Sequence, residues 1–145
     1  MSDAWTEETM AALRGAGYRA GGARRAVVEL LGGQTCCLTA QEILDRLREQ
    51  GRRVGVASVY RTLELLAEQK LVHRVQIGQG SARYEPLFAA GEHHHHLVCD
   101  GCGKVEAFSD DVLEVAIDAV AGGLGYAVEG HDVVLRGACD ECVTQ

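Results

Sequence analysis

Residues 57–70, ASVYRTLELLAEQK, decide the fold of the first half of this 145-residue chain. Apolar residues recur in this stretch at helical spacing, at Val59, Leu63, Leu66 and Ala67. They predict an amphipathic helix. The two runs that follow, LVHRVQI and ARYEPL, flank a glycine-rich turn at 78–80 and predict a β-hairpin.

Upstream of this helix the sequence predicts three more, at 3–16, at 23–31 and from 40 until Gly51 ends the third. Thr39 and Glu42 form a capping box at the start of the third helix. Helices followed by a two-stranded ribbon are typical of a winged helix-turn-helix, in which the helix beginning near Ala57 would enter the major groove of DNA. Any small helical domain with a hairpin shares this pattern, so the pattern alone does not establish DNA binding.

Two Cys-x-x-Cys pairs lie in the second half, Cys99-Asp100-Gly101-Cys102 and Cys139-Asp140-Glu141-Cys142. Each pair places two thiolates on one tight turn, which supplies half of a tetrahedral zinc shell. Four thiolates leave no open coordination position, so the spacing predicts a structural Zn²⁺ site. A thioredoxin-like redox pair needs only one such motif, and disulfides are disfavoured in a chain without an export signal.

Four consecutive histidines, His93, His94, His95 and His96, precede the first cysteine pair. Alternate side chains of a strand face opposite sides. His93 and His95 would therefore point one way and His94 and His96 the other, so that one run can supply two separate metal sites. A purification tag is the alternative, but tags lie at chain termini and usually run longer.

The second half predicts a small β–α–β arrangement. HHHHLVCDGCGKVEAF indicates a strand, a knuckle and a second strand, and 132–136 indicates a final strand. Between them Ser109 is expected to cap a helix whose apolar face consists of Val112, Leu113, Ala116, Ile117 and Val120. A sheet this small has bare edges, so we expect a homodimer.

Charge is divided unevenly along the chain. Residues 1–83 carry 12 Lys and Arg against 9 Asp and Glu, whereas residues 84–145 carry 2 against 12. A mildly basic half suits phosphates and an acidic half suits cations, although surface charge also varies without any function. We expect an α+β chain with a winged-helix DNA-binding domain at 1–84, a hinge at 85–92, and a small α/β dimerisation and metal-binding domain at 93–145.

Several classes of protein are disfavoured. No run of about 18 apolar residues is present, so we expect no membrane partner. The first residues, MSDAWTEETM, lack the basic region of a secretory signal, and six cysteines without an export signal indicate a reducing, cytoplasmic location. No nucleophile elbow, phosphate-binding glycine loop or His-Glu-x-x-His motif occurs, so we expect no enzyme.

Five segments, in this order, resemble the ferric uptake regulator superfamily of metal-responsive repressors: TAQEIL, GVASVYRTLELL, ARYE, HHHHLVCDGCGKVEAF and RGACDEC. The resemblance runs from about Gly17 to Cys142. It implies a winged-helix domain, a hinge, a β-α dimerisation domain, and repression of metal-uptake or stress genes when metal is bound. One departure is Gly21-Gly22-Ala23, which stands where the family usually has Thr-Pro-Gln.

The resemblance also implies site residues by position. It places the structural zinc on the four cysteines. It places an additional metal site on His93, His95, Glu114 and His131. It places the sensory site on His94, His96 and Glu85, with a further ligand from Cys37 or from His73 on the hairpin. It points to DNA contacts from Tyr60 and Arg61, with Arg19 and Arg24 nearby, and we expect Ser58 to be a further donor.

We predict a homodimeric, zinc-responsive repressor that binds double-stranded operator DNA. Imidazoles with a thiolate favour Zn²⁺ as the regulatory metal, whereas imidazoles with a carboxylate favour Fe²⁺. An iron-responsive or peroxide-responsive repressor is therefore the alternative within the family. A metal-buffering protein is the alternative from another class, and a metallohydrolase is disfavoured because it needs an open zinc position.

Overall fold

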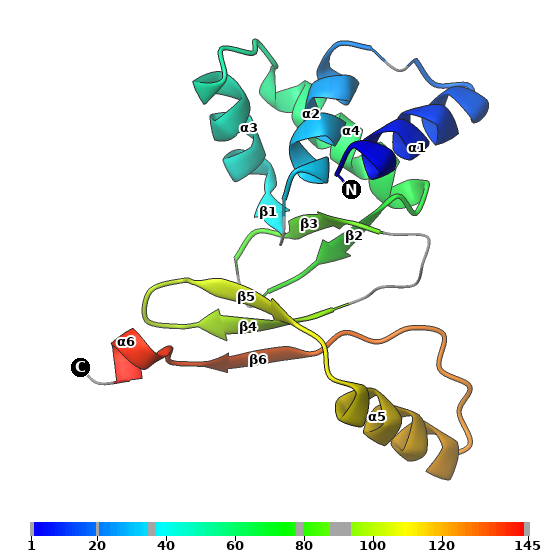
Figure 1. Ribbon diagram of the computed structural model, residues 1–145, viewed down its shortest axis with the longest axis vertical. Coiled ribbons are helices and arrows are strands. Elements are labelled where there is room, and N and C mark those ends of the chain that lie inside the picture. The colour runs from blue at the N-terminus through cyan, green and yellow to red at the C-terminus, as the bar shows by residue number, and fades with distance from the viewer. Residues whose placement is uncertain (1, 20, 35–36, 78–79, 88–93, 144–145) are drawn as a thin grey trace. The chain divides into compact units, whose positions relative to one another are not determined.

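The computed structural model describes residues 2–19, 21–34, 37–77, 80–87 and 94–143. They belong to two compact units, Met1–Glu92 and His93–Gln145 (Figure 1). The mixture of helices and sheets confirms the α+β class. In the described part of the chain, no helix is long and apolar enough to cross a membrane.

Four helices make up most of the first unit: α1 (Ser2–Gly15), α2 (Ala23–Gly32), α3 (Ala40–Glu49) and α4 (Val56–Glu68). These are the four helices that the sequence predicts, within one or two residues at each end. Their apolar faces meet in one core, where several side chains have no exposed surface: Leu13, Val27, Leu31, Ile43, Leu47, Leu63 and Leu66.

The start of α3, its end and the turn that follows it are each set by interactions between residues close in sequence. Thr39 caps α3 by accepting a hydrogen bond from the backbone N–H of Glu42 at 3.1 Å, which confirms the predicted capping box. The helix ends where Gly51 takes a φ of 77°, a left-handed conformation that glycine adopts at little cost. The N–H of Arg52 then bonds back to the carbonyl of Leu47 at 2.9 Å. This turn sends the chain directly into α4.

A three-stranded antiparallel sheet completes the first unit, with β1 (Leu38–Thr39), β2 (Val72–Val75) and β3 (Arg83–Pro86) in the order β1-β3-β2. Strands β2 and β3 form the predicted hairpin, here called the wing, whose turn includes two residues outside the described part. Because β3 extends to Pro86, the first two residues of the expected hinge belong to a strand. Residues 88–92 of that hinge lie outside the described residues.

The second unit contains β4 (His95–Cys99), β5 (Val105–Phe108), α5 (Asp111–Gly123), β6 (Val134–Gly137) and α6 (Asp140–Val143). The sheet order is β5-β4-β6, with β4 antiparallel to β5 and parallel to β6. The final strand lies slightly later than the predicted 132–136. The short helix α6 was not predicted.

Helix α5 differs from its prediction in two ways. Its N-cap is Asp110 rather than Ser109, and the Asp110 carboxylate accepts from the N–H groups of Val112 and Leu113. The expected apolar face is only partly covered: Leu113 and Ile117 are half-buried, and no residue of α5 is fully buried. Among the described residues of the second unit, only His95, His96 and Cys99 are buried. A unit with so little buried apolar surface needs a metal or a partner chain to be stable.

Candidate metal and DNA-binding sites

Two backbone turns bring the four cysteines together. Cys99 ends β4, Cys102 follows in the turn, Cys139 precedes α6 and Cys142 lies inside it. All four sulfur atoms lie within 4.8 Å of one another, and Cys102 Sγ is 3.8 Å from Cys139 Sγ. Zn–S bonds of about 2.3 Å in a tetrahedron separate the sulfurs by ~3.8 Å, whereas disulfide sulfurs are ~2.05 Å apart. This cysteine cluster therefore fits a structural zinc site.

The electrostatics of the cysteine cluster favour a bound cation. Backbone N–H groups, first that of Cys139 and then that of Cys102, stabilise the Cys99 thiolate and lower the pKa of this thiol to about 6. The sulfurs of Cys99 and Cys139 have the opposite effect on Cys142 and raise its pKa to about 12. A divalent metal would replace the thiol protons. Zinc binding should therefore weaken steadily as the pH falls, because protons compete for thiols with a raised pKa, such as Cys142, already near neutral pH. Cys99, with a pKa of about 6, should be the last of these thiolates to be protonated.

Gly101 lies between the first two cysteines and faces the opposite turn. A Cβ atom at this position would lie 3.0 Å from Cys142 Sγ and 3.2 Å from Cys142 Cβ. The close approach of the two turns therefore favours glycine, because a methyl group at this position would displace Cys142 by a few tenths of an ångström. The sequence analysis assigned no role to Gly101, because the contact joins residues some 40 positions apart and no local pattern reports it.

Replacing Gly101 by alanine is expected to weaken zinc binding by about 10-fold or more, since the two turns must separate to admit the methyl group and the ligands lose their orientation. Competition with a chromophoric zinc chelator measures this change. Gly137→Ala is the matched control, because nothing lies within 4 Å of a Cβ at that position. Equal zinc affinities for the two variants would show that the close approach does not matter.

A second cluster joins α5 to the sheet. Glu114 Oε1 lies 2.6 Å from His95 Nε2, and Glu114 Oε2 lies 2.6 Å from His131 Nε2. The Val133 N–H donates to His95 Nδ1 at 3.3 Å and orients this ring. The three side chains offer ligand atoms within 4.8 Å of one another. We call them the glutamate–histidine cluster. They are three of the four residues implied for the additional site, and the fourth, His93, lies outside the described residues.

The residues implied for the sensory site occur as two groups, one in each unit. In the first unit, the wing pairs His73 with Glu85, and His73 Nδ1 lies 3.3 Å from Glu85 Oε1. Cys37 is buried just before β1, and its sulfur lies within 4.8 Å of a Glu85 carboxylate oxygen. In the second unit, the rings of His94 and His96 lie with centroids 5.4 Å apart. Alternation along a strand is expected to place them on the side opposite His95.

The residues implied for DNA binding gather at the start of α4. Arg19, Arg24, Ser58 and Arg61 line one surface hollow of about 660 Å³. Arg24 is held there by a 3.0 Å hydrogen bond to the carbonyl of Arg19 and by a cation–π contact with Tyr18, 5.7 Å from the ring centre. Tyr60, the fifth residue expected to contact DNA, is exposed on α4.

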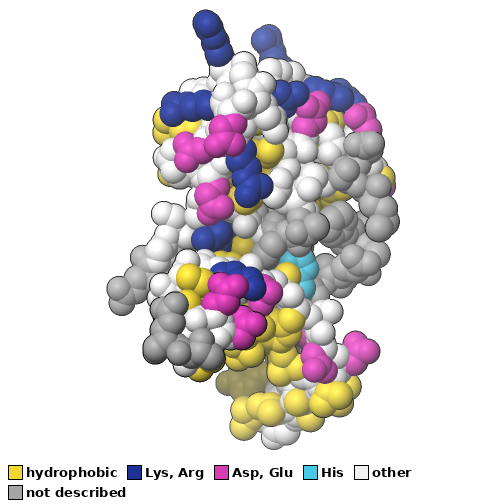
Figure 2. Space-filling view, turned by 60° about the vertical axis from the view of Figure 1, so that its left-hand side comes forward, with side chains coloured by type: hydrophobic (Ala, Val, Ile, Leu, Met, Phe, Trp, Pro, Cys, Tyr) yellow, Lys and Arg dark blue, Asp and Glu magenta, His cyan; other side chains and the backbone are white. Residues whose placement is uncertain are grey.

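A second basic hollow was not predicted. Arg48, Arg52 and Arg53 line a hollow of about 550 Å³ at the turn between α3 and α4. Arg52 is fixed by Glu29, 2.6 Å away, and its guanidinium lowers the pKa of that carboxyl. This hollow could have been predicted from the two adjacent arginines in the run GRRVG, residues 51–55. Figure 2 shows Lys and Arg side chains gathered on the surface of the first unit.

A winged-helix unit followed by a unit with a cysteine cluster that fits zinc is typical of metal-dependent transcriptional regulators. The chain belongs to the ferric uptake regulator family, whose pattern matches residues 15–136. Proteins of this family are metal-responsive transcriptional repressors rather than enzymes. The chain is therefore a metal-responsive repressor.

Individual relatives agree with this assignment. The ferric uptake regulation protein of Bacillus subtilis (strain 168) is 33% identical over 132 residues, which cover 90% of this chain and 89% of that protein. The Vibrio cholerae ferric uptake regulator is 32% identical, with a TM-score of 0.79 over 88% of this chain and 97% of that one. The Helicobacter pylori regulator is 26% identical, with a TM-score of 0.83 over 99% and 94%.

Proposed function

We propose that this chain is a homodimeric repressor that binds operator DNA when zinc occupies a sensory site shared by its two units. The hollow lined by Arg19, Arg24, Ser58 and Arg61 carries the DNA-binding part of the proposal. Arg19 precedes α2, Arg24 lies in the first turn of α2, and Ser58 and Arg61 lie on α4. Together they combine positive charge with hydrogen-bond donors. Such groups hold phosphates and read base edges when a recognition helix enters the major groove. We propose that the chain acts in the cytoplasm, where a repressor can bind its operator.

The DNA-binding proposal predicts that Arg61→Ala weakens operator binding by about 5- to 150-fold, the equivalent of the ~1–3 kcal/mol that a good base or phosphate contact contributes. Fluorescence anisotropy with a labelled operator at several salt concentrations measures the change. Arg14→Ala on α1 is the charge-matched control and should bind like the parent. If Arg61→Ala binds operator as tightly as the parent at matched salt, α4 is not the helix that docks.

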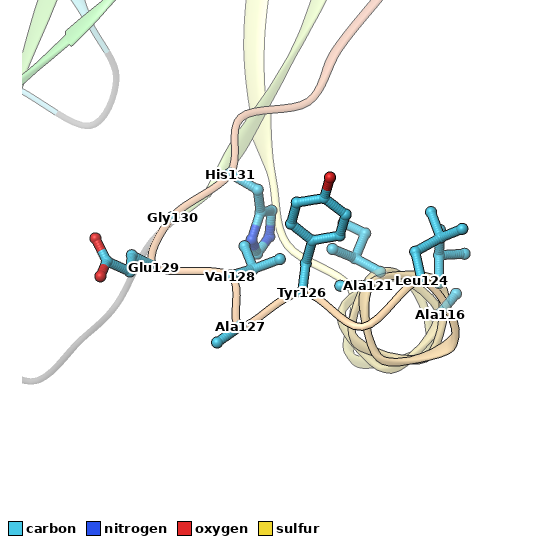
Figure 3. Close-up of a pocket in the computed structure, with 11 residues that line it drawn as sticks. Ala116, Ala121, Leu124, Tyr126, Ala127, Val128, Glu129, Gly130 and His131 are labelled. Carbon is cyan, nitrogen blue, oxygen red and sulfur yellow. The ribbon is translucent and has the colours of Figure 1, made fainter.

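Dimerisation is supported by the uncovered apolar surface of the second unit. Val112, Leu124 and Tyr126 are 78%, 72% and 73% exposed. Helix α5 and the segment after it border an apolar hollow of about 740 Å³, in which the ring of Tyr126 stands between Leu124 and His131 (Figure 3). Figure 2 shows hydrophobic side chains gathered over this part of the unit. We propose that a second copy of the chain covers this surface, since exposed apolar patches of this kind mark interfaces.

The glutamate–histidine cluster is proposed as the additional metal site, with His93 as its fourth ligand. Two imidazoles and a carboxylate within 4.8 Å of one another suit Zn²⁺ or a similar divalent ion. The Helicobacter pylori relative is described as having three functional metal binding sites. This chain would also have three sites: the cysteine cluster, the glutamate–histidine cluster and the sensory site.

We propose the sensory ligands to be His73 and Glu85 of the wing and His94 and His96 of the second unit, with Cys37 as a substitute or fifth ligand. The 3.3 Å approach of His73 to Glu85 and the paired rings of His94 and His96 support this set. A metal bound by both groups would restrain the two units and hold the two winged domains of a dimer at a spacing that fits successive major grooves.

Zinc is proposed as the regulatory metal because imidazoles and a thiolate outnumber carboxylates in this set. Fe²⁺ is the second candidate. The Glu85 carboxylate suits iron in a larger shell, and the Bacillus subtilis relative is named for ferric uptake.

A further inference from the structure

Trp5 joins helix α1 to the point where the chain leaves the wing. It is the single tryptophan of the chain and is 4% exposed. Its indole Nε1–H donates a hydrogen bond to the carbonyl of Leu87 at 3.1 Å, between residues 82 positions apart. A buried indole N–H usually has a hydrogen-bond partner. Here the partner lies directly after β3, so the bond fixes the end of that strand to α1.

Leu87 is held by both of its backbone groups. Its N–H donates to the carbonyl of Leu71 at 3.0 Å, which extends the pairing of β2 and β3 by one step. Its carbonyl accepts from Trp5. Leu87 is also the last described residue of the first unit. The Trp5 bond is therefore the last restraint on the chain in the described part of that unit.

The proposed sensory ligand Glu85 lies two positions before Leu87 on the same strand. It is 3% exposed and pairs with His73 across the wing. The ends of strands open locally at little cost in free energy. Glu85 is one residue from the end of β3, so its position depends on how firmly that end is held. A metal shared with the second unit requires this carboxylate to stay in one place.

We propose that Trp5 is a positioning residue for the metal response. Its bond to Leu87 holds the end of β3, and with it the Glu85 carboxylate, where the sensory metal binds. The inference rests on the proposed function, because it requires Glu85 to be a sensory ligand. Trp5 itself contacts neither metal nor DNA. Loss of the bond should therefore weaken zinc binding at the sensory site and leave the cysteine cluster and metal-free operator binding unchanged.

Trp5→Phe tests the bond, because it removes the N–H donor and keeps an aromatic ring in the core. The full-length protein, with its cysteine-bound zinc in place, is titrated with buffered Zn²⁺, and operator binding is followed by fluorescence anisotropy of labelled DNA. We expect the free zinc concentration at half-maximal operator binding to rise about fivefold, the equivalent of the ~1 kcal/mol that an intramolecular hydrogen bond contributes.

Leu13→Val is the matched control for a general loss of stability. Leu13 is also fully buried on α1. It lies eight positions beyond Trp5, which is about 12 Å along the helix axis. Both variants should lower the melting temperature, but only Trp5→Phe should shift the zinc midpoint. Equal midpoints for Trp5→Phe and the parent, or the same shift in Leu13→Val, would overturn the inference.

The parent protein gives an independent signal, because all of its tryptophan emission comes from Trp5. Zinc at the sensory site should change the intensity or wavelength of this emission, with the same midpoint as operator binding. His94→Ala should abolish the change. Emission that zinc does not alter in the parent, or that changes equally in His94→Ala, would also overturn the inference. If zinc does not alter operator binding by the parent, the proposed function fails instead.

Discussion

Cys99→Ser is expected to unfold the second unit and abolish the dimer. The described part of that unit buries only two histidines and Cys99 itself, so it has little apolar core to hold it together. In such a unit the free energy of zinc binding is folding free energy, about 10–16 kcal/mol for structural zinc near neutral pH. Analytical ultracentrifugation, thermal unfolding and zinc content measure the loss.

Cys37→Ser is the matched control for this experiment. It also removes one thiol, but Cys37 lies in the first unit and outside the cysteine cluster. It should therefore remain dimeric and retain the cluster's zinc. A Cys99→Ser protein that stays dimeric with an unchanged melting temperature would show that the cysteine cluster is not structural.

His94→Ala and His96→Ala are expected to lose the stimulation of operator binding by metal while the dimer remains intact. The rings of His94 and His96 lie together, so removing either one should take a ligand from the proposed sensory site only. Coupling between an effector site and a binding site is typically worth about 5- to 150-fold in affinity, and all of it should disappear. Operator binding by the variants with and without zinc measures the effect.

His131→Ala is the comparison variant on the other side of the strand. It removes a member of the glutamate–histidine cluster and leaves both proposed sensory histidines in place. It should keep a metal response. If His94→Ala and His96→Ala break the dimer and leave the response intact, the two histidine faces have been assigned the wrong way round.

The helices of the first unit could be predicted because they depend on residues that are close together in the sequence. Leu63 and Leu66 follow the helical period, and Thr39 with Glu42 marks a helix start by a hydrogen bond between near neighbours. The same reasoning was wrong for the N-cap of α5. Ser109, Asp110 and Asp111 are all capping residues, and sequence alone does not choose among them.

Features that depend on distant contacts were not predictable in the same way. The exposure of the α5 apolar face in the single chain could not be read from the helical pattern, because burial depends on what packs against the helix. The preference for glycine at position 101 depends on Cys142, which the chain reaches only after a strand, a helix and another strand. The second basic hollow forms because the turn after α3 brings Arg48 close to Arg53.

The metal clusters could be predicted in part. Two Cys-x-x-Cys pairs predict one zinc site because each pair is already half a shell. The pairing of Glu114 with His95 and His131 came from resemblance, since the residues are distant in sequence, and their 2.6 Å contacts now support it. The identity of the sensory metal follows from neither route, because imidazole binds both zinc and iron.

The most direct measurement is a metal titration read by operator binding. The full-length protein keeps its cysteine-bound zinc, is freed of weaker metal with a chelator, and is titrated with buffered Zn²⁺ or, under anaerobic conditions, with Fe²⁺. Nanomolar free zinc should raise operator affinity by about 5- to 150-fold. Activation by Fe²⁺ with no response to zinc would overturn the choice of metal, and operator binding that no metal changes would contradict metal-dependent repression itself.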